Sequence, residues 1–209
     1  MYANGEGVPE NDAEAVKWFR KAAEQGYAYA QHTLGFMYAN GEGVPENDAE
    51  AVKWYRKAAD QGYLDAQYNL GTMYANGEGV PENDAEAVKW YRKAADKGYA
   101  LAQYNLGIMY DNGEGVPEND AEAVKWYRKA ADQGLANAQL NLGVMYDNGE
   151  GVPENNIRAY VWWSMAKTQG NANAASNIDI LKPDMTPQQI ADGQALAAKC
   201  YESNYNDCD

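Results

Sequence analysis

Few residues in this sequence carry the side chains that catalysis requires. The chain has a single histidine, His32, and two cysteines, Cys200 and Cys208. A hydrolase needs a nucleophile next to a base, and no serine or cysteine recurs beside His32. We therefore interpret His32 as a satisfied or surface histidine and predict that the protein has no catalytic residues.

The acidic segment NGEGVPEND, first present at residues 4–12, recurs along the chain and suggests a metal or phosphate site. A calcium loop needs alternating oxygen ligands that end in a bidentate glutamate, but glycines and Pro117 break that register in the copy that begins at Asp111. A phosphate-binding loop needs a lysine, which the segment lacks. Paired carboxylates of a glycosidase lie in one asymmetric cleft, whereas these acids return in every copy. We predict no metal and no cofactor, and a connector in which Gly5 ends one helix and Asp12 caps the next.

This segment is part of a longer repeat. Copies begin at Met1, Met37, Met73, Met109 and Met145, so that successive starts differ by 36 residues. The second, third and fourth copies differ at only a few positions, and the fifth drifts after its first residues. A fixed period of roughly 20–50 residues is typical of stacked arrays rather than of closed globules.

Each copy holds two helical patterns, of which the second is NDAEAVKWYRKAADQG. This helix is predicted to begin after an N-cap at Asp48 and to stop at Gly62. We expect Trp54 to flank its apolar stripe and the basic residues to lie on the opposite side. The stripe consists of Ala51, Val52, Tyr55, Ala58 and Ala59, and the basic side of Lys53, Arg56 and Lys57.

The first pattern, AQYNLGTMYAN, places Ala66, Leu70, Met73 and Tyr74 on one face of a helix. Gly71 lies in the middle of this helix, where glycine costs on the order of 1 kcal/mol relative to alanine. Because glycine recurs at the equivalent positions, we expect it to allow the close approach of a neighbouring helix, for which the small alanines of the second helix are suited.

The motif L-G-x-x-Y, present as Leu70-Gly71…Tyr74, resembles the first-helix signature of tetratricopeptide repeats. The 36-residue period, the connection G-x-G-V-P-x-(N/D) and the pattern A-x-x-W-Y-x-x-A-A are more specifically similar to the Sel1-like repeat family, over about residues 1–180. This resemblance implies an all-α fold, a right-handed α-solenoid of antiparallel helix pairs in which first helices line the concave side. It also implies the adaptor role that relatives have in signalling, complex assembly and contact between host and bacterium.

We divide the chain into a repeat array, residues 1–180, and a C-terminal capping helix with its tail, residues 181–209. The first copy lacks the body of its first helix, so we expect the chain to be a fragment, and the fifth copy is degenerate. The capping helix is predicted from Thr186 as N-cap, Pro187 as first helical residue and Gln189 closing a capping box. A solenoid needs such an element to cover its last apolar face. One side of this helix is predicted to carry Ile190, Ala191, Gln194, Ala197 and Ala198.

Cys200 and Cys208 are separated by seven residues, and the sequence allows two interpretations. They form a disulfide that ties the tail to the last helix, or they remain reduced near a frayed end. We favour the disulfide because CYESNYNDC offers loop residues to close it, and we therefore predict a periplasmic or secreted protein. Two thiolates with no nearby histidine make half a zinc site at most.

The net charge of −14 and the pI near 4.4 narrow the class of partner. Such a surface repels phosphate backbones and anionic membranes, so we predict no nucleic-acid binding and favour a basic or neutral protein or peptide. No stretch approaches the roughly 18 apolar residues of a membrane span, so no membrane insertion is expected.

Differences between the copies concentrate in the first helix, whereas the second helix is nearly constant through the fourth copy. Four positions of the first helix vary, at i, i+3, i+7 and i+10, which form a single face. In tetratricopeptide arrays the same offsets from L-G-x-x-Y line the peptide groove, so the resemblance implies a partner-binding surface here. The alternative is drift of exposed positions after duplication, although the charged side of the second helix has hardly changed. The predicted partner-binding residues are Tyr29, His32, Phe36, Asp65, Tyr68, Thr72, Leu101, Tyr104, Ile108, Asp111, Asn137, Leu140, Val144 and Asp147.

These observations predict a non-enzymatic module that binds a protein or peptide in a concave groove. Two alternatives remain open at this point. Because some bacterial relatives were linked to β-lactam compounds, the family resemblance allows a weak hydrolase or ligand binder for cell-wall-like molecules, for which the sequence offers no catalytic pair. The near-identity of the second to fourth copies also allows a purely structural spacer.

Overall fold

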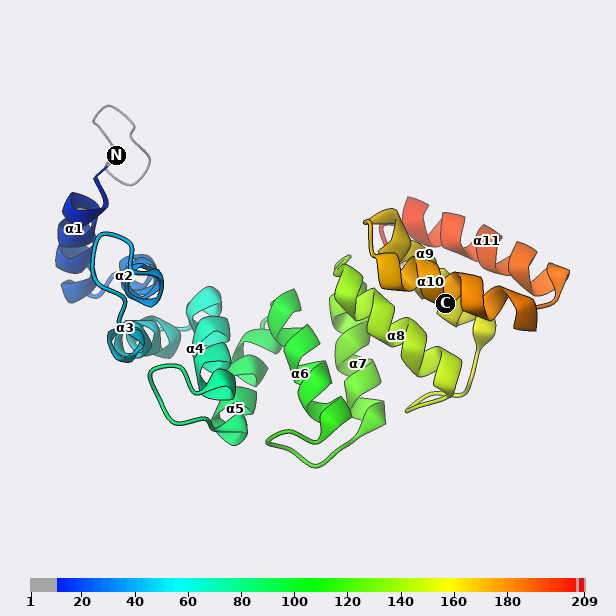
Figure 1. Cartoon of the computed structure of the whole chain (residues 1–209), viewed down its shortest axis with the longest axis horizontal. Coiled ribbons are helices and arrows are strands. Elements are labelled where there is room, and N and C mark those ends of the chain that lie inside the picture. Colours follow the sequence, from blue (N-terminus) through cyan, green and yellow to red (C-terminus); the bar gives the residue numbers. More distant parts are fainter. Residues whose placement is uncertain (1–10, 206, 209) are drawn as a thin grey trace. The chain divides into compact units, whose positions relative to one another are not determined.

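The computed structural model describes residues 11–205, 207 and 208 (Figure 1). Within these residues the protein consists of eleven α-helices and one short 3-10 helix, with no strand. The all-α fold predicted from the sequence is confirmed. The chain divides into two compact units, residues 1–97 and residues 98–209, which we call unit 1 and unit 2.

Unit 1 contains five helices that pack in chain order, each against the next. The first helices of its repeats are α2 and α4, and the second helices are α1, α3 and α5 (Figure 1). Their bounds are α1 Asp12–Glu24, α2 Ala28–Asn40, α3 Asp48–Asp60, α4 Leu64–Asn76 and α5 Asp84–Ala95.

Unit 2 continues the same alternation and adds the C-terminal elements (Figure 1). Helices α6 to α10 pack each against the next, and α11 packs against α9. Helix α9 therefore contacts both α10 and α11. The bounds are α6 Ala100–Asn112, α7 Asp120–Ala131, α8 Ala136–Asn148, α9 Asn156–Thr168, α10 Ala172–Leu181, the 3-10 helix η1 Lys182–Asp184, and α11 Pro187–Glu202.

The second helices are capped by asparagine, not by the aspartate that follows it. Asn47 has extended backbone angles, φ −159° and ψ 91°, and its side chain accepts a hydrogen bond of 3.0 Å from the N–H of Glu50. The prediction of an N-cap at Asp48 is wrong, because the chain has already turned helical there. An aspartate in the first turn still interacts favourably with the positive end of the helix dipole. The same asparagine cap is present as Asn11, Asn83, Asn119 and Asn155.

The connector between first and second helix uses its two glycines differently. The first of them, Gly41 in the second copy, ends α2 in the left-handed conformation, φ 70°, as its equivalent Gly5, which lies outside the described residues, was predicted to do. The second, Gly43, has φ 67° and lies against the preceding repeat. A Cβ at this position would be 2.3 Å from the carbonyl carbon of Asp12. The connector therefore packs successive repeats together, which the sequence analysis did not foresee.

The glycine in the middle of each first helix allows the close approach that we expected. A Cβ on Gly71 would be 2.7 Å from the ring of Tyr91 in the following helix. The nearest atoms are those of this aromatic ring and not those of the small alanines. Gly35, Gly107 and Gly143 meet Tyr55, Tyr127 and Trp163 in the same way.

The basic side of the second helix is not simply a solvated face. Arg56 is half-buried and donates a hydrogen bond to the hydroxyl of Tyr74, contrary to its predicted place opposite the apolar stripe. The ammonium group of Lys57 lies 3.9 Å from the ring centroid of Trp54, which is buried. Packing therefore accounts for much of the constancy of the second helix.

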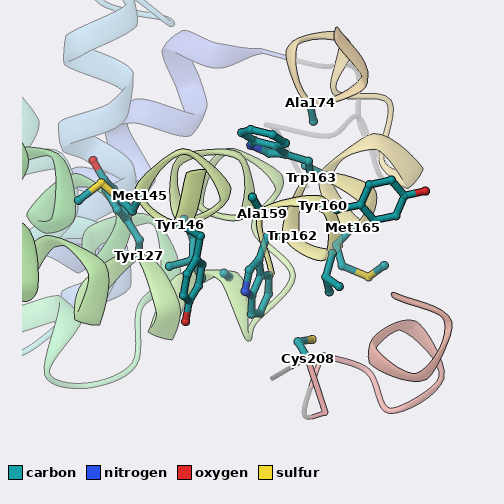
Figure 2. Close-up of a cluster of buried hydrophobic side chains, with 14 of the residues drawn as sticks. Tyr127, Met145, Tyr146, Ala159, Tyr160, Trp162, Trp163, Met165, Ala174 and Cys208 are labelled. Carbon is teal, nitrogen blue, oxygen red and sulfur yellow. The ribbon is translucent and has the colours of Figure 1, made fainter. Parts of the chain in front are cut away.

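Each unit has its own core of alanine, leucine, methionine and aromatic side chains. In unit 2, Trp162 and Trp163 of α9 are fully buried, with Tyr127, Met145 and Tyr146 nearby (Figure 2). The same core includes the disulfide between Cys200 and Cys208, so the disulfide prediction is confirmed.

The helix predicted to follow Thr186 is present as α11. Thr186 and Gln189 form the predicted capping box, with Pro187 at the start of the helix. The predicted side is only partly correct, since Ala197 is buried and Ile190 half-buried, whereas Ala191, Gln194 and Ala198 are exposed. The buried side consists instead of Gly193, Ala197 and Cys200. Tyr160 of α9 packs against this side, so closely that a Cβ on Gly193 would lie 2.9 Å from its ring.

Candidate protein-binding surface

The variable positions of the first helices lie at the surface of both units. We call the six in unit 1 and the eight in unit 2 the variable face of each unit. The exposed fraction is 61% for Tyr29, 42% for Phe36 and 39% for Leu101, and Asn137 is also exposed. The remaining ten are half-buried: His32, Asp65, Tyr68, Thr72, Tyr104, Ile108, Asp111, Leu140, Val144 and Asp147.

An aromatic cluster occupies the N-terminal part of the variable face of unit 1. The ring of Tyr29 meets the rings of Phe19 and Tyr63 edge-on, with both centroid distances at 6.4 Å. His32 lies 5.1 Å from Tyr63 and 5.5 Å from Tyr55, measured between ring centroids. Edge-to-face aromatic pairs of this kind are favourable and stabilise the positions of the rings that take part.

His32 is half-buried within this cluster. Burial lowers its pKa, and the carboxylate of Asp65 opposes that shift. Its Nε2 lies 3.2 Å from Nδ2 of Asn69, and because an amide nitrogen donates, Nε2 accepts the hydrogen bond. The interpretation of His32 as a satisfied histidine is confirmed, since its contacts are an amide and two tyrosine rings.

In each unit the variable positions contact tyrosines of the second helices, which we call the tyrosine floor of that unit: Tyr55 and Tyr91 in unit 1 and Tyr127 in unit 2. The ring of Tyr68 lies 5.9 Å from that of Tyr91, and the ring of Tyr104 lies 6.0 Å from that of Tyr127, between centroids, with the two rings of each pair tilted by 42° and 40°. Burial raises the pKa of Tyr55 and Tyr127 well above the usual range, so both remain neutral. The floor therefore supports the variable side chains with rigid uncharged rings.

The floor hydroxyls also hydrogen-bond to variable residues. The hydroxyl of Tyr91 is 3.1 Å from Oγ1 of Thr72, and that of Tyr127 donates to Oδ2 of Asp111 at 3.0 Å. Burial raises the pKa of Asp111, and this hydrogen bond opposes the rise. Sequence reasoning assigned the floor tyrosines to the core stripe and missed this contact. The sequence does contain a signal for it, because each floor tyrosine stands 23 residues after a variable position, as Tyr91 does after Tyr68.

Buried glutamines connect the repeats behind the variable face. Gln31 donates from Nε2 to the carbonyl oxygen of Ala23 at 3.0 Å, and Gln61 of the next repeat donates to Oε1 of Gln31 at 2.7 Å. Gln133 and Gln169 bond in the same way to Gln103 and Gln139. This glutamine ladder joins each of these first helices to the C-terminal ends of the second helices before and after it, and sequence reasoning missed it.

Among the described residues, no three His, Cys, Asp or Glu side chains come together in a group that would hold a metal ion. None of the helices in the described ranges is both long enough and apolar enough to cross a membrane.

Comparison with protein families matches this architecture directly. The Sel1 repeat matches residues 1–27, 28–63, 64–99, 100–135 and 136–171, which together span most of the chain. The chain belongs to the Sel1 repeat family. Each complete matched segment runs from the start of a first helix to the end of the following second helix, so the matched unit is the helix pair seen in the structure.

Solved structures of other Sel1 repeat proteins are similar to this one. A protective antigen of uropathogenic Escherichia coli strains is 39% identical with a TM-score of 0.86, over 95% of this chain and 44% of that protein. A Sel1 repeat protein from Oxalobacter formigenes is 41% identical with a TM-score of 0.79, over 83% of this chain and 71% of the other. Cysteine-rich protein B of Helicobacter pylori is 25% identical with a TM-score of 0.50, over 64% and 96%.

This chain therefore spans less than half the length of the Escherichia coli antigen. No curated protein sequence matches it. Sel1 repeats generally mediate protein–protein interaction and serve as non-enzymatic scaffolds.

Proposed function

We propose that this Sel1 repeat protein is a non-enzymatic module that binds a protein or peptide partner on its variable face. The observation that carries the proposal is the exposure of large apolar side chains there. Tyr29, Phe36 and Leu101 leave 61%, 42% and 39% of their surface open to solvent. Exposed aromatic and apolar groups on a rigid support are the usual anchors of a protein interface.

The tyrosine floor favours binding without rearrangement. Tyr68 and Tyr104 are held by ring contacts to Tyr91 and Tyr127, so little side-chain entropy is lost when a partner covers them. The net charge of −14 favours a basic or neutral partner through long-range attraction. The surface therefore suits recognition by shape and aromatic contact.

The constancy of the second helix does not separate this proposal from simple drift. Arg56 and Lys57 contact Tyr74 and Trp54, so packing restrains them whether or not a partner binds. The proposal rests on the exposed apolar groups instead. The alternative of a weak hydrolase gains no support from His32, which contacts Asn69 and tyrosine rings.

The test compares variants of the full chain as bait for partner proteins. Tyr29→Ala combined with Leu101→Ala removes one exposed group from the variable face of each unit and is expected to abolish capture of partners that the unaltered chain retains. The matched control is Tyr201→Ala in α11, a tyrosine with the same exposed fraction, 61%. Equal capture by all three proteins refutes the proposal. Unchanged helicity by circular dichroism shows that the variants are folded.

We also propose that the protein works outside the reducing cytosol. The Cys200–Cys208 disulfide supports this, because such bonds persist in the periplasm or outside the cell. The experiment is thiol labelling of the protein taken from its own cells without a reductant. Protection of both cysteines is expected, and labelling of both thiols contradicts the proposal.

A further inference from the structure

A cavity of about 310 Å³ lies at the C-terminal end of the variable face of unit 2. It is open to solvent and adjoins the last two variable residues, and residues of α9, α10 and η1 line its other sides. Its volume is at the lower end of the roughly 300–1,000 Å³ of small-ligand sites. The residues that bear on its chemistry are Val144, Asp147, Trp163, Ile180, Leu181 and Asp184.

In the fifth repeat a tryptophan stands where the second, third and fourth repeats have a floor tyrosine. In the fourth repeat Tyr127 donates its hydroxyl hydrogen to Asp111. Trp163 stands at the position of Tyr127 in the next repeat, and its indole N–H donates to the carbonyl oxygen of Leu140 at 3.0 Å. Asp147, the equivalent of Asp111, therefore receives no hydrogen bond from the floor. Among the described residues no side chain pairs with its carboxylate.

A second carboxylate reaches the same cavity because α10 is short. Pro183 has no N–H and disfavours a continued helix, so α10 ends at Leu181 and η1 brings Asp184 to the cavity. Burial, followed by the carboxylates of Glu154 and Asp184, raises the pKa of Asp147. The half-buried carboxylate of Asp147 thus lies near other carboxylates, of which Asp184 is exposed at the same cavity, and a bound cation would stabilise its charged form.

The other lining residues are mostly apolar, and Asn177 adds one side-chain amide. Leu181 is buried, whereas Ile180 leaves 70% of its surface exposed although it is a large aliphatic residue. Lys182, the nearest cation in sequence, pairs with Asp179 at 3.5 Å. An apolar wall beside two carboxylates fits a side chain with an aliphatic stem and a cationic head, because the stem covers the apolar surface while the head pairs with the acids.

We propose that this cavity binds an arginine or lysine side chain of the protein partner, with its stem against Val144 and Ile180 and its cationic head between Asp147 and Asp184. The inference rests on the proposed function, since the cavity is continuous with variable residues. It adds the chemistry of one partner residue and the place where that residue binds.

The test uses two small probes on the full chain, followed by the indole N–H signal of Trp163 in NMR titrations. N-acetylarginine amide carries the cationic head, and N-acetylcitrulline amide has nearly the same shape without the charge. Saturable shifts of the Trp163 signal with the arginine probe are expected, with citrulline binding at least about tenfold more weakly, since charge-assisted hydrogen bonds are roughly twice as strong as neutral ones. N-acetyllysine amide reports whether an ammonium head is also accepted. Equal binding of arginine and citrulline, or no binding of either cation, overturns the proposal.

Variants of the two aspartates locate the site. Asp147→Asn and Asp184→Asn are each expected to weaken binding of the arginine probe at least threefold. The control Asp60→Asn, an exposed aspartate of α3, removes the same charge in unit 1 and is expected to leave binding unchanged. An equal loss with Asp60→Asn overturns the assignment. If partner capture is lost with Tyr29→Ala and Leu101→Ala but kept with both cavity variants, the proposed function stands and this inference fails.

Discussion

Lys97 interrupts the glutamine ladder, and restoring a glutamine there should stabilise the protein. In three places a glutamine of the following repeat donates to Oε1 of a buried glutamine, at 2.7 Å for Gln31, 2.6 Å for Gln103 and 2.9 Å for Gln139. The fourth buried glutamine is Gln67, and the position that would serve it is occupied by Lys97. Oε1 of Gln67 is buried without a hydrogen-bond partner.

The expected gain follows from this single atom. A buried acceptor without a hydrogen bond destabilises a protein by about 1–3 kcal/mol, and a typical hydrogen bond contributes a net stabilisation of roughly 1 kcal/mol. Removing a lysine near a helix C-terminus forfeits about 0.3 kcal/mol of the interaction with the helix dipole. Lys97→Gln should therefore raise the free energy of unfolding by about 1 kcal/mol, or about 2–4 °C in Tm for a chain of this size.

Urea unfolding followed by circular dichroism measures the change, and amide hydrogen exchange in α4 and α5 shows whether it is local. Lys97→Ala is the matched control, because it removes the charge without supplying an amide. The reverse variant, Gln61→Lys, leaves Oε1 of Gln31 unpaired and should destabilise by about 1 kcal/mol or more. Equal stability of Lys97→Gln and Lys97→Ala would refute the reasoning.

Three further outcomes follow from close contacts and charge, each measured by urea unfolding. Gly43→Ala should lower the free energy of unfolding by at least about 2 kcal/mol, because it adds a clash with Asp12 to the strain of a positive φ. Gly26→Ala is the control and should lower it by about 1 kcal/mol, because nothing lies within 4 Å of the new Cβ. Equal losses of stability in the two variants would contradict the packing role of Gly43. Gly71→Ala should destabilise the protein by about 1–2 kcal/mol despite the better helix propensity of alanine, because the new Cβ would lie 2.7 Å from the ring of Tyr91. A gain in stability would show that the ring moves aside. The pKa of Asp147 is raised in the folded state, so its ionisation opposes folding as the pH rises through that pKa. Asp147→Asn should therefore raise the unfolding midpoint at pH 7 but not at pH 3, and the opposite dependence would exclude the stated cause.

The repeat period and the helix stops were predictable because they rest on local chemistry. Gly62, for example, follows α3 with φ 85°, which glycine adopts readily. The N-cap was predicted one residue late because asparagine and aspartate cap equally well. Only the extended backbone of Asn47 distinguishes it from Asp48.

The residues that support the variable side chains from below were harder to predict from the sequence. Tyr55 has the spacing of a core residue, and it does pack in the core, yet its ring also supports His32. Gln31 is a single polar residue in an otherwise apolar face, and nothing local shows that its amide reaches the next repeat. Both contacts join residues from different helices, so they depend on how the helices stack. That stacking is set by glycine contacts such as the one between Gly35 and Tyr55.

Comparing the repeat copies at one position does not reveal the hydrogen bonds that the residue makes, as the aspartate at the cavity of unit 2 shows. Asp111 and Asp147 are the same residue at equivalent positions of successive first helices. Asp111 accepts a hydrogen bond from Tyr127, whereas the corresponding Trp163 directs its N–H to a backbone carbonyl. Identical side chains therefore differ in what they can bind, because the difference lies in the supporting helix. The hydrogen bonding of a variable residue therefore depends on the residue beneath it, and in the fifth repeat Trp163 leaves Asp147 without the hydrogen bond that Tyr127 gives Asp111.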